Sequence, residues 1–172
     1  ISHLVGSLLE RYAAVSATAP GGEGGGRVTV AWSPAGGTGK TTAALAYAAQ
    51  RVAEGKRVLY LNLESFSSSP LYFAESGRSI SAVFAKLDGN VEVLLQGLRQ
   101  QDAGSGIYYF GRPENYDDIH ILTEEDQERL LRACARSVDE VVVDTAGGYG
   151  QRIRALLETA DGVLPWEQVS RE

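Results

Sequence analysis

The sequence predicts a three-layer α/β fold, in which helices flank a mostly parallel sheet. Short apolar segments alternate with helical segments along most of its 172 residues. This alternation is typical of right-handed βαβ units, whose parallel strands are buried on both faces. A glycine-rich loop also separates the first apolar segment from an alanine-rich helix. Together these observations favour a single doubly covered sheet.

The first βαβ unit is the clearest part of the pattern. In Arg27–Trp32, large apolar side chains occupy every second position, which suits a buried strand. Residues Thr41–Glu54 are rich in alanine, the best helix former. Gly55 is a typical residue for ending that helix. The nearly continuous apolar run Arg57–Glu64 then predicts a second, fully buried strand.

The middle of the chain is less regular. After a serine-rich loop, the spacing of apolar residues predicts helices over Ser79–Leu87 and Val91–Gln100, followed by a strand over Ile107–Phe110. This segment is therefore the third strand candidate of the sheet.

The last part of the chain repeats the helix and strand pattern. Thr123 is a suitable N-cap for a helix that runs to Ser137, because acidic residues fill its first turn. The sequence then predicts a strand over Glu140–Asp144, a helix over Gln151–Thr159 and a final strand over Gly162–Trp166.

The N-terminal residues are expected to lie outside this domain. Residues 1–18 predict a connector helix, residues 19–26 a flexible linker because they are mostly glycine, and residues 27–172 the domain itself. The chain starts at Ile1 and contains no methionine, so we expect it to be part of a longer product.

The composition points to a cytoplasmic globular protein. Apolar residues make up 44% and charged residues 22%, with no apolar run long enough for a membrane span and no secretory signal. A single cysteine, Cys134, fits a reducing compartment. The net charge of −6 makes nucleic acid an unlikely partner, because binding to it relies on clustered basic residues.

The stretch "SPAGGTGKTT" predicts a phosphate-binding loop. Glycines let backbone N–H groups surround an anion at the start of a helix, whose positive end faces it. Lys40 supplies a charge for the β and γ phosphates, and the Thr41 hydroxyl is a ligand for Mg²⁺. The loop residues expected to hold a nucleotide are Gly36, Gly37, Thr38, Gly39, Lys40, Thr41 and Thr42.

Asp144 is the expected second half of this site. It directly follows the apolar strand "EVVV", so its carboxylate should emerge at the carboxyl edge of the sheet, beside the phosphate loop. A strand-end carboxylate in that place is suited to Mg²⁺, and the alternative is an ordinary turn aspartate.

The motifs resemble those of the MinD/ParA superfamily of P-loop ATPases. Within it, "SPAGGTGKTT", "RVLYLNLESF" and "EVVVDTAGG" look most like the CpaE/TadZ-type ATPases of pilus assembly and localisation, over Arg27–Trp166. The resemblance implies that the connector helix follows an absent receiver-like domain. Ala35 occupies the place of the superfamily's signature lysine, which reaches across a dimer to the partner's nucleotide.

The same resemblance assigns further roles. It makes Asp144 the Walker B aspartate, which holds Mg²⁺ through water, and it implies that the Gly147 N–H contacts the γ-phosphate. Two aspartates usually end the second strand, and here Asn62 and Glu64 stand in their places. Glu64 is thus a catalytic candidate beside Lys40 and Asp144, with a solvated strand-end glutamate as the alternative.

These expectations lead to three hypotheses. The first is a weak ATPase that binds ATP with Mg²⁺, forms a homodimer, and localises a pilus or secretion apparatus. The second is a non-catalytic nucleotide-binding scaffold, favoured by Ala35 and Asn62. The third is a ParA-like DNA-partitioning ATPase or a tyrosine-kinase-like relative. The acidic net charge argues against the DNA partner, and the lack of a tyrosine-rich tail argues against the kinase.

The other candidate residues are expected to have structural rather than functional roles. His3 and His120 lie far apart in the sequence without metal-ligand spacing, so they are expected to be surface residues. Cys134 falls within a helix and is expected to be inert. Arg152 and Arg154 follow the Asp144 loop and are expected to lie on a solvated helix face, with a partner contact as the alternative.

Overall fold

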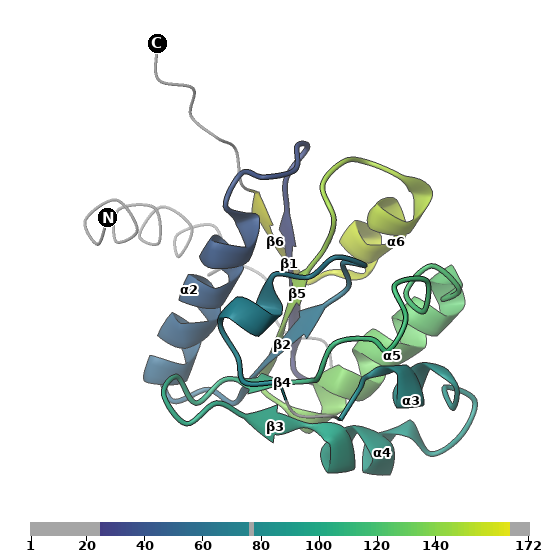
Figure 1. Ribbon diagram of the computed structural model, residues 1–172. Helices are drawn as coiled ribbons and strands as arrows, with labels where there is room; N and C mark the ends of the chain where they lie inside the picture. Colours follow the sequence, from purple (N-terminus) through teal and green to yellow (C-terminus); the bar gives the residue numbers. More distant parts are fainter. Residues whose placement is uncertain (1–24, 76–77, 166–172) are drawn as a thin grey trace.

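The computed structural model describes residues 25–75 and 78–165 and contains one sheet (Figure 1). The connector helix expected over 1–18, residues 19–24 of the expected linker, and Trp166 lie outside the described residues. The strands are β1 Arg27–Trp32, β2 Val58–Asn62, β3 Gln100–Gln101, β4 Tyr108–Tyr109, β5 Glu140–Asp144 and β6 Gly162–Pro165.

The strands follow the order β3-β4-β2-β5-β1-β6, and every neighbouring pair is parallel except β3 with β4. This confirms the expected three-layer α/β class with a mostly parallel sheet. In the register, Ala31 of β1 and Asn62 of β2 both lie beside Asp144 of β5. The loops that follow these three strands therefore meet at one edge of the sheet.

The helices lie on both faces of this sheet (Figure 1). They are α2 Lys40–Ala53, the 3-10 turn η1 Ser69–Leu71, α3 Ser81–Phe84, α4 Val91–Leu98, α5 Glu124–Ser137 and α6 Gln151–Thr159. Helix α2 covers one face, and α3 to α6 lie on the other. No helix in the described part of the chain combines the length and apolar character that crossing a bilayer requires.

Two apolar cores follow from the alternation of side chains along the strands. In β5, Val141 and Val143 pack with α5 and α6, whereas Val142 packs with α2. Because successive side chains point to opposite faces, Glu140 and Asp144 share the α2 face with Val142. Both ends of one buried strand therefore direct a carboxylate toward the same helix.

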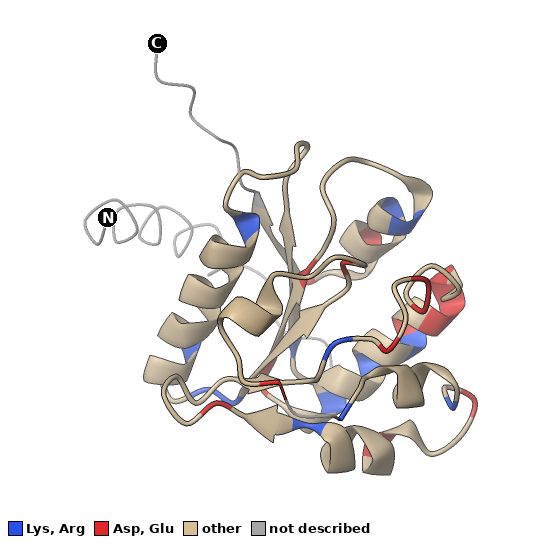
Figure 2. Cartoon of the chain, in the orientation of Figure 1, with Lys and Arg blue, Asp and Glu red and all other residues tan. Residues whose placement is uncertain are grey.

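Helix α5 begins as the sequence predicts. The Thr123 hydroxyl accepts a hydrogen bond from the Asp126 N–H at 3.1 Å, and the Asp126 carboxylate accepts one from the Thr123 N–H at 3.0 Å. This reciprocal pair satisfies N–H groups that a helix start leaves without partners. Acidic residues gather at this start of α5 in Figure 2.

The helix predicted over Ser79–Leu87 is wrong in extent, since α3 covers only Ser81–Phe84. The residues before α3 contact the segment that follows β4 instead. Ser79 pairs with Gly111 in a parallel bridge, and the Ile80 N–H donates to the Gly111 carbonyl at 3.2 Å. This sheet contact competes with the first helical turn and replaces it.

The helix predicted over Val91–Gln100 is also too long, because α4 ends at Leu98. Arg99 has an extended backbone, with φ −64° and ψ 136°, which turns the chain out of the helix. Gln100 and Gln101 then form the edge strand β3 against β4. Apolar spacing does not distinguish this short edge strand from a last helical turn.

Candidate functional site

The phosphate loop lies between β1 and α2, at the carboxyl edge of the sheet. Gly37 and Gly39 adopt φ values of 70° and 87°, which favour glycine over any residue with a Cβ. Gly39 is the N-cap of α2 and no side chain caps the helix there. The start of α2 thus offers backbone N–H groups, together with the positive end of the helix dipole, to the exposed loop.

The buried Ser33 side chain holds the loop in place by hydrogen bonds. It is fully buried, and its Oγ accepts hydrogen bonds from the Thr38 hydroxyl at 3.2 Å and from the Ala35 N–H at 3.4 Å. A single buried hydroxyl thereby ties the two ends of the glycine-rich turn together.

The loop after β5 packs directly against the phosphate loop. A Cβ on Gly147 would lie 2.8 Å from the backbone of both Ala35 and Gly36, so a larger residue does not fit without a shift. The Trp32 Nε1–H donates to the Gly148 carbonyl at 2.8 Å, and the Gly148 N–H donates to the Ser33 carbonyl at 3.2 Å. Gly147 is therefore next to the phosphate loop, as its predicted role requires.

Lys40 joins the two candidate carboxylates. Its Nζ lies 2.8 Å from Glu64 Oε1 and 2.8 Å from Asp144 Oδ1. Lys40 and Asp144 are both buried, and Glu64 is half-buried. The structure thus brings together all three residues that the sequence analysis named as catalytic candidates.

One ammonium group here serves two carboxylates. Burial alone would lower the pKa of Lys40, but the charges and hydrogen bonds of Asp144 and Glu64 outweigh it and raise that pKa. Burial raises the pKa of Glu64, and the charge of Asp144 adds to this, while the hydrogen bond from Lys40 opposes it. Two carboxylates share one ammonium group, so the cluster carries an excess negative charge when both are ionised.

Tyr60 completes the cluster from within β2. Its buried hydroxyl lies 2.7 Å from Asp144 Oδ2 and 3.1 Å from the amide Nδ2 of Asn62. The Asn62 Oδ1 accepts a hydrogen bond from the Glu64 N–H at 2.9 Å. Burial, and then the charge of Asp144, raise the pKa of Tyr60, so the phenol keeps its proton.

The donor set fits Mg²⁺. This ion prefers oxygen ligands and usually takes one or two carboxylates, several waters and substrate phosphates. The Asp144 carboxylate and the Thr41 hydroxyl at the start of α2 supply such oxygens, and the excess negative charge favours a cation. The described residues contain no cluster of three or more His, Cys, Asp or Glu side chains able to hold a metal alone, so phosphate oxygens are needed.

Thr42 turns toward a different loop. Its hydroxyl lies 3.1 Å from the hydroxyl of Tyr72, which follows η1. The loop after β2 is thereby linked to the first turn of α2.

A second buried carboxylate lies at the opposite end of β5. Glu140 Oε1 accepts hydrogen bonds from Tyr47 and Thr29, both at 2.7 Å, and Oε2 accepts one from Arg51 Nε at 2.6 Å. A second cation is near this carboxylate, since Arg27 Nε lies 4.0 Å from Oε1. This carboxylate has both its charge and its hydrogen bonds satisfied inside the protein.

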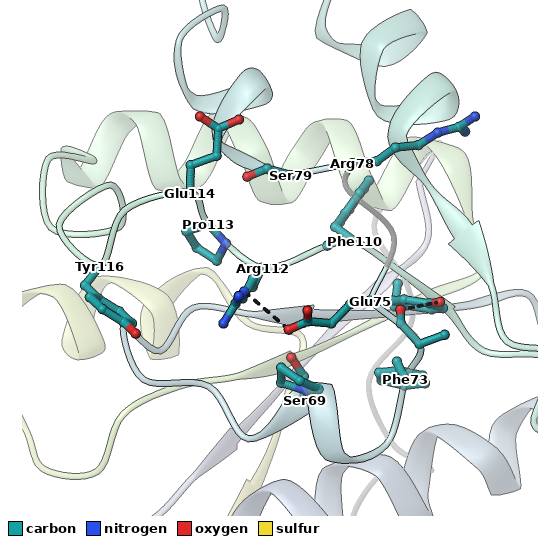
Figure 3. A pocket seen from close by; sticks show the side chains of 14 residues that line it. Ser69, Phe73, Glu75, Arg78, Ser79, Phe110, Arg112, Pro113, Glu114 and Tyr116 are labelled. Carbon is teal, nitrogen blue, oxygen red and sulfur yellow. Dashed lines mark hydrogen bonds and ion pairs between the residues drawn. The ribbon is translucent and has the colours of Figure 1, made fainter.

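A hollow of about 400 Å³ lies between the loops after β2 and β4 (Figure 3). Phe73 and Tyr109 stack in its wall with ring centroids 4.4 Å apart. Phe73 also packs against the Tyr60 ring, with 5.6 Å between their centroids. Glu75 and Arg112 face one another at 3.4 Å. The hollow does not include the phosphate loop, so it is distinct from the predicted site.

The remaining candidates have ordinary surroundings. His120 is exposed, and its Nε2 lies 2.8 Å from Ser65 Oγ, whereas His3 falls outside the described residues. Cys134 is fully buried, and burial raises the pKa of its thiol to about 12, so it is inert as expected. Arg154 pairs with Glu158 on an exposed helix face at 2.8 Å. Arg152 is half-buried and donates to the carbonyl of Ile119.

The sequence analysis missed Ser33, Tyr60 and the role of the Asn62 amide. Tyr60 lies in an apolar run, where an aromatic residue predicts core packing rather than a polar contact. The strand alternation does contain a usable signal, because Tyr60 and Asn62 occupy the same face of β2 as the end of the strand approaches Asp144.

Comparison with known proteins shows what this fold resembles. No protein-family model and no curated protein matches the sequence. Among solved structures, a ParA family ATPase from Chlorobium tepidum TLS matches with a TM-score of 0.68 and 20% identity, over 81% of this chain and 59% of that chain. The septum site-determining protein MinD from Pyrococcus horikoshii OT3, complexed with Mg-ADP, matches with a TM-score of 0.65 and 16% identity, over 81% and 57%.

A third match is the cobyrinic acid a,c-diamide synthase from Mycobacterium smegmatis, with bound ADP and magnesium. Its TM-score is 0.63 at 21% identity, over 82% of this chain and 59% of that chain. The chain therefore shares the fold of these three structures, and it spans less than two thirds of the length of each.

Proposed function

We propose that this chain binds ATP with Mg²⁺ at the carboxyl edge of its sheet and hydrolyses it slowly. One observation supports this most strongly. The uncapped start of α2, Lys40 and the Asp144 carboxylate lie together behind an exposed loop with two left-handed glycines. This combination offers donors to phosphate and oxygens to a divalent cation at the same place.

The residues divide the work as follows. The phosphates lie against the backbone N–H groups of Gly36 to Thr42, with the Gly147 N–H at the γ-phosphate. Lys40 contacts the β and γ phosphates, and Thr41 and Asp144 hold Mg²⁺. When bound, Mg²⁺ neutralises charge on the phosphates. Glu64 positions or deprotonates the attacking water, since positioning and charge stabilisation dominate phosphoryl transfer.

A nucleotide-switched homodimer, formed face to face across this edge, is the second part of the proposal. Large apolar side chains are exposed on the loops that follow β2, β4 and β5, among them Phe66, Tyr116 and Tyr149. Phe66 and Tyr116 stack on each other with ring centroids 4.6 Å apart. An apolar group of this kind around a ligand site suits a protein contact. Ala35 implies that such a dimer lacks the cross-nucleotide lysine contact.

The cellular role that we propose is localisation of a pilus or secretion apparatus in the cytoplasm, on the basis of the resemblance to CpaE/TadZ-type ATPases. Affinity capture with the wild-type chain tests it, with Lys40→Ala as the nucleotide-free control. Recovery of pilus or secretion proteins by the wild type alone is expected, and equal recovery by both chains contradicts a nucleotide-controlled partner.

The alternative is a scaffold that binds nucleotide without turnover. The hydrogen bonds of Asn62 favour it, because its amide is occupied with Tyr60 and Glu64 where a second carboxylate is usual. Measuring ATP turnover and molar mass for the wild type and Glu64→Gln, with and without Mg²⁺, separates the two. Slow Mg²⁺-dependent turnover that Glu64→Gln abolishes supports the ATPase. Tight ATP binding without any turnover in the wild type leaves only the scaffold.

A further inference from the structure

The direction of each hydrogen bond around Asn62 can be assigned from its partners. The Glu64 N–H can only donate, so the atom of Asn62 that faces it at 2.9 Å is the carbonyl Oδ1. The other end of the same amide, Nδ2, then faces the Tyr60 hydroxyl at 3.1 Å. Because an amide NH₂ can only donate, Tyr60 accepts this bond through its oxygen.

The proton of the Tyr60 hydroxyl is thereby directed to Asp144. Its oxygen lies 2.7 Å from Asp144 Oδ2, and an ionised carboxylate can only accept. Oδ2 is thus held by a neutral donor inside the sheet, while Oδ1 faces Lys40 at 2.8 Å. The two oxygens of one carboxylate have different partners, of which Tyr60 is neutral and Lys40 is a cation.

We propose that Asn62 and Tyr60 form a positioning relay that orients Asp144 for Mg²⁺. In this relay, Asn62 fixes the direction of the Tyr60 hydroxyl, and Tyr60 holds Oδ2 so that Oδ1 faces the phosphate loop. The inference rests on the proposed Mg²⁺-nucleotide site and deepens it. It also gives Asn62 a function of its own in place of a lost acid.

The packing around Tyr60 supports this assignment. The ring is buried on the α2 face of the sheet and contacts Phe73, which stacks in turn on Tyr109. A ring fixed in this way brings its hydroxyl to one place. Outer partners that orient a metal ligand typically change metal affinity about 10- to 100-fold when removed.

The experiment measures ADP affinity by calorimetry, with saturating magnesium chloride and with EDTA, for the wild type and Tyr60→Phe. The relay predicts that Tyr60→Phe weakens binding about 10- to 100-fold in Mg²⁺ and leaves binding in EDTA unchanged. Tyr47→Phe is the matched control, because Tyr47 is also a buried phenol that donates to a carboxylate of β5. It should change neither affinity.

Asn62→Asp gives a second and sharper test. A carboxylate at position 62 cannot donate to Tyr60, so it competes with Asp144 for the phenol proton. The relay predicts that Asn62→Asp also weakens Mg²⁺-ADP binding, and that the double variant with Tyr60→Phe is no weaker than either single variant. If Asn62 merely replaces an acid, Asn62→Asp should instead bind Mg²⁺-ADP more tightly.

The outcomes distinguish this inference from the proposed function. If the wild type does not bind ADP in either buffer, the nucleotide site itself is wrong. If the wild type binds Mg²⁺-ADP and Tyr60→Phe binds it equally well, or loses affinity equally in EDTA, the relay is overturned and the site remains. Tighter Mg²⁺-ADP binding by Asn62→Asp overturns the relay as well.

Discussion

Strand β5 places a buried carboxylate at each of its ends, and α2 supplies a cation to both. Asp144 meets Lys40, the first residue of α2, and Glu140 meets Arg51 in the last turn of that helix. Each carboxylate also accepts a hydrogen bond from a buried tyrosine at 2.7 Å. Each end of the strand therefore combines the same three groups: a buried carboxylate, a cation from α2 and a tyrosine hydroxyl.

The two ends differ in how their charges balance. Arg51 and Arg27 face the carboxylate of Glu140 at 2.6 Å and 4.0 Å, and Arg51 also pairs with the exposed Glu54, so two cations balance two carboxylates. At the other end, Asp144 and Glu64 share Lys40, and no other cation pairs with either carboxylate within the described residues.

The difference shows which buried ion pair is structural and which is a candidate site. Arg51 holds Glu140 with a planar group that loses little freedom on binding, whereas Lys40 is a flexible point charge that can move to a phosphate. A cluster that is one positive charge short, next to the uncapped start of α2, supports the proposal that Mg²⁺ binds here together with a nucleotide.

The largest expected effect is at Glu140. Glu140→Gln should lower the free energy of unfolding by about 2 kcal/mol, because it removes the charge that accepts three hydrogen bonds, while Arg51 keeps its pair with Glu54. Asp144→Asn should change it by less than about 1 kcal/mol, since it relieves the crowding of two carboxylates. Urea unfolding of the ligand-free chains measures both values, and equal losses at the two ends would contradict the comparison.

The contact between the two loops gives the next effect. Gly147→Ala should weaken ATP binding about tenfold or more, because overpacking of this kind costs about 1–3 kcal/mol and the backbone of Ala35 and Gly36 has to move. Gly150→Ala is the control, since an added Cβ there meets nothing within 4 Å. Equilibrium binding of ATP in Mg²⁺ checks both, and similar affinities for the two variants would show that the loops are not coupled.

Alkaline pH tests the Glu140 end. Burial and then the charge of Glu140 raise the pKa of Tyr47 from 10.0 to about 12. The native state therefore favours the protonated phenol, and this contribution is complete below pH 10 and is lost as the pH rises through about 12. The free energy of unfolding, measured by urea denaturation, should fall more steeply with pH over that range in the wild type than in Tyr47→Phe. Equal slopes would mean that Tyr47 titrates normally.

The smallest expected effect is at Glu64. Because burial raises its pKa, the charged form is disfavoured in the folded chain, and a neutral side chain of the same shape removes that cost. Glu64→Gln should leave the ligand-free stability unchanged or increase it by up to about 1 kcal/mol. A clear loss of stability in urea unfolding would show that the Lys40 pair holds the fold together.

The sequence predicted the parts of the molecule that depend on local patterns. The strand "EVVVD", the Thr123 cap and the βαβ unit around the glycine-rich loop all follow from apolar runs and residues with strong positional preferences. Tertiary pairing decided the regions where prediction failed. Ser79 joins Gly111 in the sheet, and Gln100 joins an edge strand, and neither contact is visible in a local window.

The candidate site divides in the same way. Lys40 and Asp144 could be named from their places at a helix start and a strand end, and Glu64 from the resemblance to the MinD/ParA superfamily. The structure brings both carboxylates within hydrogen-bonding distance of Lys40. The link through Tyr60 could not be predicted, because it depends on the direction of one phenol hydroxyl in an otherwise apolar strand. Asn62 looked like a missing acid because its partner was unknown.

The most direct test of the account is the binding of ATP in Mg²⁺ to the wild type, Lys40→Ala and Lys56→Ala, measured by calorimetry. Lys56 is an exposed lysine just after α2, remote from Asp144 along the chain. We predict that the wild type and Lys56→Ala bind Mg²⁺-ATP alike, and that Lys40→Ala loses at least tenfold in affinity, equivalent to about 1.4 kcal/mol. Equal binding by all three chains would contradict the assignment of the phosphate site.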